Sequence, residues 1–411
     1  MADTRDAATR RASRVTLVIG ALAALMEGYD LQAAGVGGAK IAKEFALNSS
    51  QMGMVFTSNT TGLFLGAAVG GWLADRIGRK WVLALSLIVF GVFTVGSALA
   101  NNYEMLVLMR FLTGLGLGGA LPNLVSIVAE SGPAEQRATR VTIITAFMPL
   151  GGVLSNLVVL ASGSDLDWRV IFHFGGWPPI LIGLAALALL PESATFLHHR
   201  REREQGVAAA GRRDTWSVLF REGRARSTLL LWITFFLTLL VLYMLLNWLP
   251  MLLSSKGFSR PETLIINMLF AAGGSLGSVV LAVAMTRLNR RYVLLGTYLA
   301  MGAALFALAA VGHEMVAASL VGIVVGFFVM GAQLVLYGLS ATLYPGHVRG
   351  TGVGWGVAVG RLGSVAGPAL AAAILAGGRS GSDVIMSILP AIAVATVTVM
   401  LLVWRAPPQG G

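Results

Sequence analysis

Two acidic residues, Glu27 and Asp30, lie inside the first long apolar stretch of this 411-residue chain. A charged side chain at the centre of a bilayer costs at least ~2.5 kcal/mol, so an acid placed there is expected to have a function. Residues three apart share one face of a helix, which brings the two carboxyl groups together. Two neighbouring carboxylates with little water around them cannot comfortably both ionise, so we expect one to hold a proton near neutral pH. The pair therefore predicts a proton-carrying site.

The composition predicts that this site sits in a membrane protein. Hydrophobic residues make up 56% of the chain and charged residues 12%, whereas a typical soluble domain is ~25% charged. Repeated apolar runs of ~20 residues predict an all-α polytopic protein rather than one buried core. Twelve transmembrane helices are expected, over residues 15–37, 52–73, 81–100, 104–129, 141–162, 169–190, 227–252, 262–285, 291–311, 315–338, 350–376 and 383–404.

The basic residues indicate which ends of these helices face the cytoplasm. If the N-terminus is cytoplasmic, 22 of the 30 Lys and Arg residues lie in cytoplasmic segments, and the two at Arg110 and Arg361 lie inside helices. The opposite loops hold the other six, which are Lys40, Lys43, Arg169, Lys256, Arg260 and Arg379. This asymmetry follows the positive-inside rule and predicts that both termini are cytoplasmic. The net charge of +11 therefore reports topology, and no nucleic-acid partner is expected.

The chain is expected to divide into two similar halves. Gly62, Gly66 and the segment 75–83 match Gly273, Gly277 and the segment 286–294 at an offset of 211. Such a parallel repeat predicts two pseudo-symmetric six-helix bundles, with substrate bound near mid-membrane between the repeats. The expected domains are a cytoplasmic N-terminal tail at 1–14, bundles at 15–191 and 227–404, a cytoplasmic linker at 192–226 and a cytoplasmic C-terminal tail at 405–411.

Three motifs carry a resemblance to a known family. Gly71-Trp72-Leu73-Ala74-Asp75-Arg76-Ile77-Gly78-Arg79-Lys80 resembles the signature of the major facilitator superfamily between its helices 2 and 3. The segment 110–119, Arg-Phe-Leu-Thr-Gly-Leu-Gly-Leu-Gly-Gly, resembles the helix 4 motif of that family. The segment 27–35 is similar to the acidic helix 1 motif of the aromatic acid:proton symporters, with Glu27 in place of the usual Asp. With Leu121-Pro122-Asn123, the chain looks most like the branch of bacterial 3-(3-hydroxyphenyl)propionate carriers.

Two buried arginines are the expected partners of an anionic substrate. A helix rise of ~1.5 Å per residue places Asp30 and Arg110 at similar depth, roughly 10 Å and 9 Å from the outer membrane face. The same arithmetic places Arg361 roughly 18 Å from the cytoplasmic face. An arginine fork holds a carboxylate through two hydrogen bonds. We expect a proton on Glu27 or Asp30 to free Arg110, Arg361 or both for an incoming carboxylate. The alternatives are a permanent ion pair that positions the first helix and a structural role for Arg110.

Further residues are expected to contact an aromatic substrate. Apolar walls, ring partners and a few polar groups suit such a ligand. The candidates are Tyr29, Asn123, Gln333 and Tyr337, of which Gln333 is a mid-helix amide that is costly to bury unless it is used. Trp248 lies near the end of a span, where an interfacial belt is the simpler explanation.

A gate is expected at the cytoplasmic turn between the second and third helices. Asp75 is placed to pair with Arg137 or Arg140 of a neighbouring loop in one conformation only. Arg349 mirrors Arg137 in the second half and is expected to serve the equivalent gate there. Four further members of the gate are expected, which are Arg76, Gly78, Arg79 and Glu130. The alternative for Asp75, Arg76, Gly78 and Arg79 is a role in membrane insertion and topology.

The resemblance implies a secondary transporter that imports aromatic carboxylates by proton symport through alternating access. It implies no cofactor beyond the proton gradient, a lipid environment, a monomer, and the bacterial inner membrane. A proton-coupled exporter of drugs or metabolites, or a symporter of a sugar or another organic acid, remains open. An enzyme is not expected, because the five His residues lack metal-binding spacing and no serine lies in a nucleophile elbow.

Overall fold

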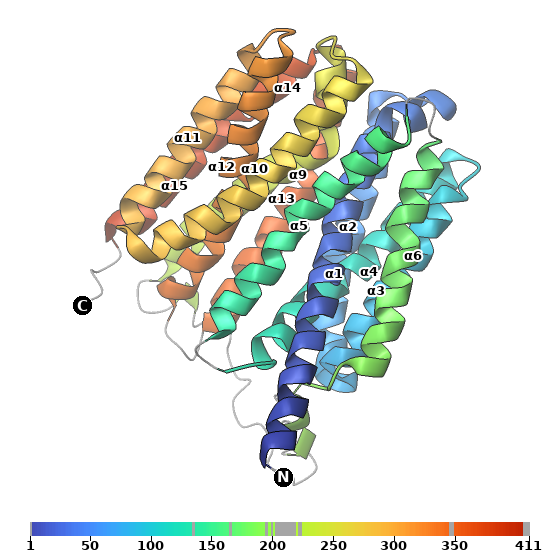
Figure 1. Ribbon diagram of the computed structural model, residues 1–411. Coiled ribbons are helices and arrows are strands. Elements are labelled where there is room, and N and C mark those ends of the chain that lie inside the picture. The colour runs from blue at the N-terminus through green and yellow to red at the C-terminus, as the bar shows by residue number, and fades with distance from the viewer. Residues whose placement is uncertain are drawn as a thin grey trace. The chain divides into compact units, whose positions relative to one another are not determined.

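The computed structural model describes residues 2–133, 136–163, 167–193, 196–198, 200–201, 219–220, 224–344 and 349–405. These residues form helices and contain no strand, which confirms the predicted all-α class (Figure 1). The long helices of the first half are α1 (Ala2–Glu44), α2 (Ser49–Ile77), α3 (Arg79–Ala98), α4 (Tyr103–Glu130), α5 (Arg137–Ala161) and α6 (Trp168–Leu189). Those of the second half are α9 (Ala225–Ser255), α10 (Arg260–Arg287), α11 (Arg290–Ala310), α12 (Met315–Leu343), α13 (Arg349–Ala376), α14 (Gly381–Ser387) and α15 (Leu389–Arg405).

The chain is a multi-pass membrane protein. Within the described residues, 11 helical segments are long and apolar enough to cross a bilayer, and one of these, Gly381–Trp404, combines α14 with α15. The helix α2 has 29 residues but is not among the 11. Its first half carries Ser, Thr, Asn and Gln side chains, which lower its hydropathy without shortening the helix. The predicted 52–73 span is therefore present as a helix of more polar composition.

The helices differ from the predicted boundaries at three places. The predicted tail at 1–14 is part of α1 from Ala2 onward, because this segment has no Gly or Pro to end a helix. At its other end α1 continues to Glu44, so that Lys40 and Lys43 lie on the helix instead of in a loop. The last span breaks at Ile388, directly before Leu389-Pro390. Proline has no N–H to donate to the preceding turn, which explains the break.

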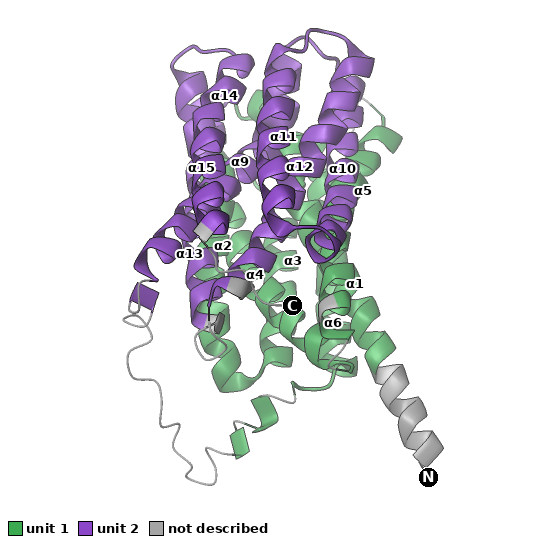
Figure 2. Cartoon of the chain, turned by 90° about the vertical axis from the view of Figure 1, so that its left-hand side faces the viewer, with its two compact units in different colours: residues 1–46, 54–211 green, residues 47–53, 212–411 purple. Residues whose placement is uncertain are grey.

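The chain folds into two compact units, shown in different colours in Figure 2. Unit 1 comprises Met1–Ala46 and Met54–Gly211, and unit 2 comprises Leu47–Gly53 and Arg212–Gly411. The boundary at Gly211 falls inside the predicted 192–226 linker, most of which lies outside the described residues. Within unit 1, α1 packs against α5 and α6, and α3 packs against α4 and α6. Within unit 2, α9 packs against α13, and α10 packs against α12.

The same backbone contacts recur in both units. A Cβ atom at Gly114 would collide with the carbonyl oxygen of Asn59, and one at Gly326 would collide with that of Phe270. Each member of the second pair follows its counterpart by 211 or 212 residues. Gly151 meets the carbonyl of Leu25 in unit 1, and Gly363 meets the carbonyl of Phe236 at the corresponding place in unit 2. Small residues let helix backbones approach closely in a membrane, so the sequence repeat is a repeat of helix crossings.

We predict that Gly114→Ala lowers the thermal unfolding temperature of the purified protein. The added methyl would overlap the backbone of α2 at Asn59, and overpacking of this kind typically costs about 1–3 kcal/mol. Gly71→Ala is the matched control, because a Cβ atom there meets nothing within 4 Å. It should leave the unfolding temperature unchanged or raise it, since Ala favours a helix more than Gly. Equal effects of the two changes would contradict this account of the crossing.

Candidate functional site

The centre of unit 1 holds an ion pair between Asp30 of α1 and Arg110 of α4. Arg110 Nη1 donates to Asp30 Oδ1 at 2.8 Å, and Nη2 donates to Oδ2 at 3.0 Å. Thr94 of α3 donates its hydroxyl to Asp30 Oδ1 at 3.3 Å. The structure thus brings together the two residues that helix rise places at similar depth. The parallel two-bond geometry is the strongest arrangement that an arginine and a carboxylate form.

This pair is removed from solvent. The side chain of Arg110 is 1% exposed and that of Asp30 is 0% exposed. The Arg110 guanidinium carbon lies 5.3 Å from the centre of the Phe172 ring of α6, within the range of a cation–π contact. Desolvating two charges costs several kcal/mol per ion, which their attraction offsets only when the geometry is good. Either charge left alone at this place is therefore strongly unfavourable.

Glu27 and Tyr29 flank Asp30 on α1 and are also buried. Glu27 is 2% exposed, which agrees with its prediction as a buried acid, although no contact tests its proposed role in proton coupling. The predicted substrate contact of Tyr29 remains a prediction. Its hydroxyl donates to the Ile171 carbonyl of α6 at 3.0 Å, and its ring lies against Gly175. Position 29 is turned toward α6, so this tyrosine packs α1 against its neighbour.

Asn123 on α4 is 3% exposed, and its amide nitrogen donates to the Gly119 carbonyl of the preceding turn at 2.8 Å. Its amide therefore bonds within its own helix, and its proposed contact with a substrate hydroxyl remains a prediction. Gln32, one turn after Gly28, was not singled out from the sequence. It is 2% exposed, and a Cβ atom at Gly152 of α5 would collide with its amide group. Gln32 is thus a buried amide at the crossing of α1 and α5.

In unit 2 the predicted anion-binding residue Arg361 lies on α13 and is 6% exposed. Its Nη1 donates to the hydroxyl of Tyr243 on α9 at 2.6 Å, and its guanidinium carbon lies 5.8 Å from the centre of that ring. Tyr243 is 2% exposed. A phenol is a neutral acceptor, and a carboxylate would bind the same guanidinium more strongly. Arg361 thus contacts a neutral phenol, and its role in anion binding remains a prediction.

The two other predicted contacts of unit 2 lie on α12. Gln333 and Tyr337 are both half-buried, and their spacing of four residues places them on one helix face. The Tyr337 ring makes an edge contact with Phe235 of α9, with ring centres 5.5 Å apart. The prediction that Trp248 belongs to an interfacial belt is wrong. Trp248 is buried and donates its indole N–H to the Pro368 carbonyl at 3.1 Å. It joins α9 to α13 and is not part of an interfacial belt.

The turn between α2 and α3 carries a polar network that joins three segments of unit 1. Gly78 adopts φ 106°, a conformation that a residue with a Cβ atom rarely adopts. A Cβ atom there would also collide with the Glu192 carboxylate, which accepts from the Lys80 backbone N–H at 3.1 Å. Arg79 pairs with Glu130 of α4 at 2.5 Å, and Ser193 donates to the other Glu130 oxygen at 2.7 Å. Glu130 and Glu192 thus contact the segment where the gate is predicted, Ser193 contacts Glu130, and the gating role of this network remains a prediction.

The predicted pairing of Asp75 with Arg137 or Arg140 in one conformation remains a prediction. The Arg140 guanidinium donates to Ser13, Ser131 and Gln136. Arg137 and Asp75 are exposed. Because α2 stays helical through Ile77, Asp75 is turned outward, and the bend at Gly78 returns Arg79 toward α4.

The remaining members of the predicted gate are Arg76 and Arg349. Arg76 is exposed and lies over the Trp72 ring, 3.8 Å from its centre. Arg349 is the first residue of α13, and its side chain lies outside the described part of the chain. Their gating roles remain predictions.

The opposite ends of the helices carry contacts that the sequence did not reveal. In unit 1, Glu44 at the end of α1 accepts from Arg169 of α6 at 2.7 and 3.0 Å and from the Trp168 indole at 2.5 Å. In unit 2, Lys256 donates to the carbonyls of Leu308 at 2.7 Å and of Ala309 at 2.8 Å, at the end of α11. Burial lowers the pKa of the Lys256 ammonium. Both contacts close helix ends and are structural.

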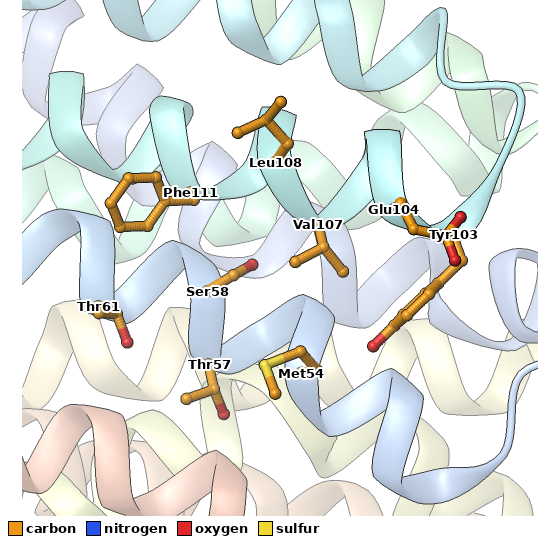
Figure 3. A pocket seen from close by; sticks show the side chains of 9 residues that line it. All are labelled: Met54, Thr57, Ser58, Thr61, Tyr103, Glu104, Val107, Leu108 and Phe111. Atoms are coloured by element: carbon orange, nitrogen blue, oxygen red, sulfur yellow. The ribbon is translucent and has the colours of Figure 1, made fainter.

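A shallow pocket of about 470 Å³ opens between α2 and α4 in unit 1 (Figure 3). It is lined by Met54, Thr57, Ser58 and Thr61 from α2 and by Tyr103, Glu104, Val107, Leu108 and Phe111 from α4. None of these residues belongs to the predicted site. Among the described residues, no three His, Cys, Asp or Glu side chains lie together in a way that could hold a metal ion.

Both the sequence and the fold of this chain match known proteins. The family model described as Major Facilitator Superfamily matches residues 20–368. The 3-(3-hydroxy-phenyl)propionate transporter of Escherichia coli (strain K12) is 40% identical over 395 residues, covering 96% of this chain and 95% of that protein. The 4-hydroxybenzoate transporter PcaK of Acinetobacter baylyi is 33% identical, covering 95% and 91%. The crystal structure of a D-xylose-proton symporter shares the fold with a TM-score of 0.77 at 20% identity, covering 96% and 98%.

We predict that Arg110→Gln destabilises the purified protein by about 3–5 kcal/mol, because it leaves the Asp30 carboxylate buried and unpaired. The double variant Asp30→Asn/Arg110→Gln should recover much of the loss, since both charges are then removed. Arg79→Gln is the control, because its pair with Glu130 is 26% and 17% exposed, and such pairs contribute up to about 1 kcal/mol. Unfolding in detergent is measured for the unmodified protein, for these three variants and for Asp30→Asn alone. Additive losses in the double variant would contradict the pairing.

Proposed function

Because the chain belongs to the major facilitator superfamily, we propose that it imports aromatic carboxylates across the bacterial inner membrane by symport with protons. The names of its relatives support the substrate class, since they are transporters of 3-(3-hydroxy-phenyl)propionate, 4-hydroxybenzoate, gallate and benzoate. The observation that carries the proposal is the buried two-bond pair of Asp30 and Arg110. The distribution of Lys and Arg supports an orientation with both termini in the cytoplasm.

Proton coupling follows from the chemistry of the Asp30–Arg110 pair. Protonation converts the Asp30 carboxylate to a neutral acid, which keeps one O–H donor and can no longer accept two charge-assisted bonds. Arg110 then remains as a buried cation whose partner has lost its charge, and an incoming anion compensates it. Glu27 lies one helical turn away and is buried, so it is placed to pass the proton to Asp30. Deprotonation restores the original pair and expels the anion.

In this proposal, Arg361 of the second unit binds the carboxylate of the substrate. Its guanidinium donates to the Tyr243 hydroxyl, so the two residues offer a cation and a phenol at one place. A substrate carboxylate would replace the phenol oxygen as acceptor, and the Tyr243 O–H would then be free to donate to it. Gln333 and Tyr337 share one face of α12 and would contact the substrate ring and its hydroxyl group.

The conformational cycle is the alternating access expected of this fold. A ligand shifts such an equilibrium only by its differential affinity for the two states. The network of Arg79, Glu130 and Ser193 would stabilise one state and break in the other. We propose that the protein works as a monomer, without a cofactor, and is driven by the proton gradient.

Asp30→Asn tests proton coupling. The amide cannot take up or release a proton, so an imposed pH gradient should no longer accumulate radiolabelled 3-hydroxyphenylpropionate in proteoliposomes. Exchange of labelled for unlabelled substrate at equal pH should persist, because it needs no net proton movement. Glu104→Gln, an exposed acid on α4, is the control and should retain accumulation. Normal gradient-driven uptake by Asp30→Asn would refute the mechanism.

Arg361→Lys tests anion recognition. Lysine keeps the charge but loses the planar fork, so we expect substrate affinity to fall at least tenfold, as for loss of one charge-assisted hydrogen bond of about 1.5–3 kcal/mol. Equilibrium binding of labelled 3-hydroxyphenylpropionate and benzoate, with a sugar as the non-ligand, measures the change. Arg287→Lys, on the exposed end of α10, should bind as the unmodified protein does. Unchanged affinity in Arg361→Lys would remove this residue from the site.

A further inference from the structure

A second depression lies in unit 2, between α11 and α15, which pack side by side (Figure 1). It encloses about 100 Å³ and lies where α11 begins and α15 ends. Its walls are the aliphatic side chains of Leu295, Val399, Met400 and Val403. Val399 is 1% exposed and Val403 is 5% exposed, so the floor belongs to the packed interior and the groove is part of the fold.

The rim of this groove has a different chemistry from its walls. Arg291, Tyr292 and Trp404 complete the lining. Tyr292 is 76% exposed and Trp404 is 61% exposed, whereas Arg291 is half-buried. Tyr and Trp are enriched where a span meets the headgroup region of a bilayer. The groove therefore runs from an apolar floor, which suits an acyl chain, to an aromatic and cationic mouth at headgroup level.

The charge at the mouth of the groove determines which class of lipid headgroup would bind there. Neither α11 nor α15 contains an Asp or Glu residue, so no carboxylate of these two helices neutralises the mouth. Arg290 directly precedes Arg291, which lines the groove, and Arg405 is the last residue of α15. Basic pockets between transmembrane helices bind anionic headgroups. The positive charge of Arg291 at the mouth is complementary to a lipid phosphate that carries a net negative charge.

We propose that this groove binds one anionic phospholipid, with an acyl chain along Leu295 and Val403 and the phosphate at Arg291. The Tyr292 hydroxyl and the Trp404 indole N–H offer donors to the glycerol and phosphate oxygens. The proposal rests on the chain spanning a membrane and is independent of the substrate, because the lining lies outside the residues proposed for transport. Positive charge that merely sets topology would attract anionic lipid without a preferred arginine, and this difference can be measured.

The test is native mass spectrometry of the delipidated full-length protein, titrated with phosphatidylglycerol and with phosphatidylcholine of the same acyl chains. The unmodified protein should bind one phosphatidylglycerol in preference to phosphatidylcholine. Arg291→Gln should weaken phosphatidylglycerol binding about fivefold, as expected for the loss of one cation at a membrane surface. Inorganic phosphate should not displace the bound lipid.

Arg287→Gln is the matched control, because this arginine lies at the same end of unit 2, is exposed, and does not line the groove. It should bind phosphatidylglycerol as the unmodified protein does. Val403→Phe should weaken lipid binding with every charge in place, because the larger side chain fills the groove. Unfolding temperatures establish that each variant is folded, and the two arginine variants decide the question without Val403→Phe. Equal losses in Arg287→Gln and Arg291→Gln, or equal binding of the two lipids, would overturn the proposal.

Discussion

The placement of two opposite charges, Asp30 and Arg110, in a part of the protein without solvent is the constraint on which unit 1 depends. Their side chains are 0% and 1% exposed, so each is tolerated only because the other is present. The pair requires α1 and α4 to be held at one separation, and α3 and α6 contribute Thr94 and Phe172 around it. A proton on Asp30 removes the negative charge of the pair and leaves the positive charge of Arg110. The same constraint therefore holds α1 beside α4 and, in the proposed mechanism, makes the site respond to protonation of Asp30.

The helix crossings that position this pair are shared by both units, whereas the charges are not. Glycines meet backbone carbonyls at matching places, as at Gly151 with Leu25 and Gly363 with Phe236. The counterpart of Asp30 at an offset of 211 is Val241, which is fully buried. At an offset of 212, Arg110 corresponds to Gly322, and Arg361 corresponds to Pro149. One scaffold thus carries a carboxylate–arginine pair in unit 1 and an arginine–phenol pair in unit 2. This asymmetry favours different tasks for the two units, proton exchange and anion recognition.

The sequence predicted those features that depend on position along a helix. Apolar run lengths predicted the spans, and the rise per residue predicted that Asp30 and Arg110 share a depth. It did not predict the contacts that depend on the direction of a side chain around its helix. Tyr29 is adjacent to Asp30 in sequence and its hydroxyl bonds to Ile171, and Trp248 is near a helix end but is buried against Pro368. Arg79 and Glu130 were both predicted as gate members, but their ion pair was not predicted. Glu192 contacts Lys80, 112 residues away, and Ser193 contacts Glu130, 63 residues away, and no local sequence pattern predicts such contacts.

The central claim is that substrate binding and protonation of Asp30 are linked, and proton uptake on binding tests it directly. The purified protein is mixed with 3-hydroxyphenylpropionate in weakly buffered detergent solution, and a pH indicator reports the protons removed from solution. Linkage between the two events requires the unmodified protein to take up protons as it binds substrate, in proportion to the sites filled. Asp30→Asn should bind substrate without this uptake. Equal proton uptake by both proteins, or none by the unmodified protein while substrate binds, would contradict the account.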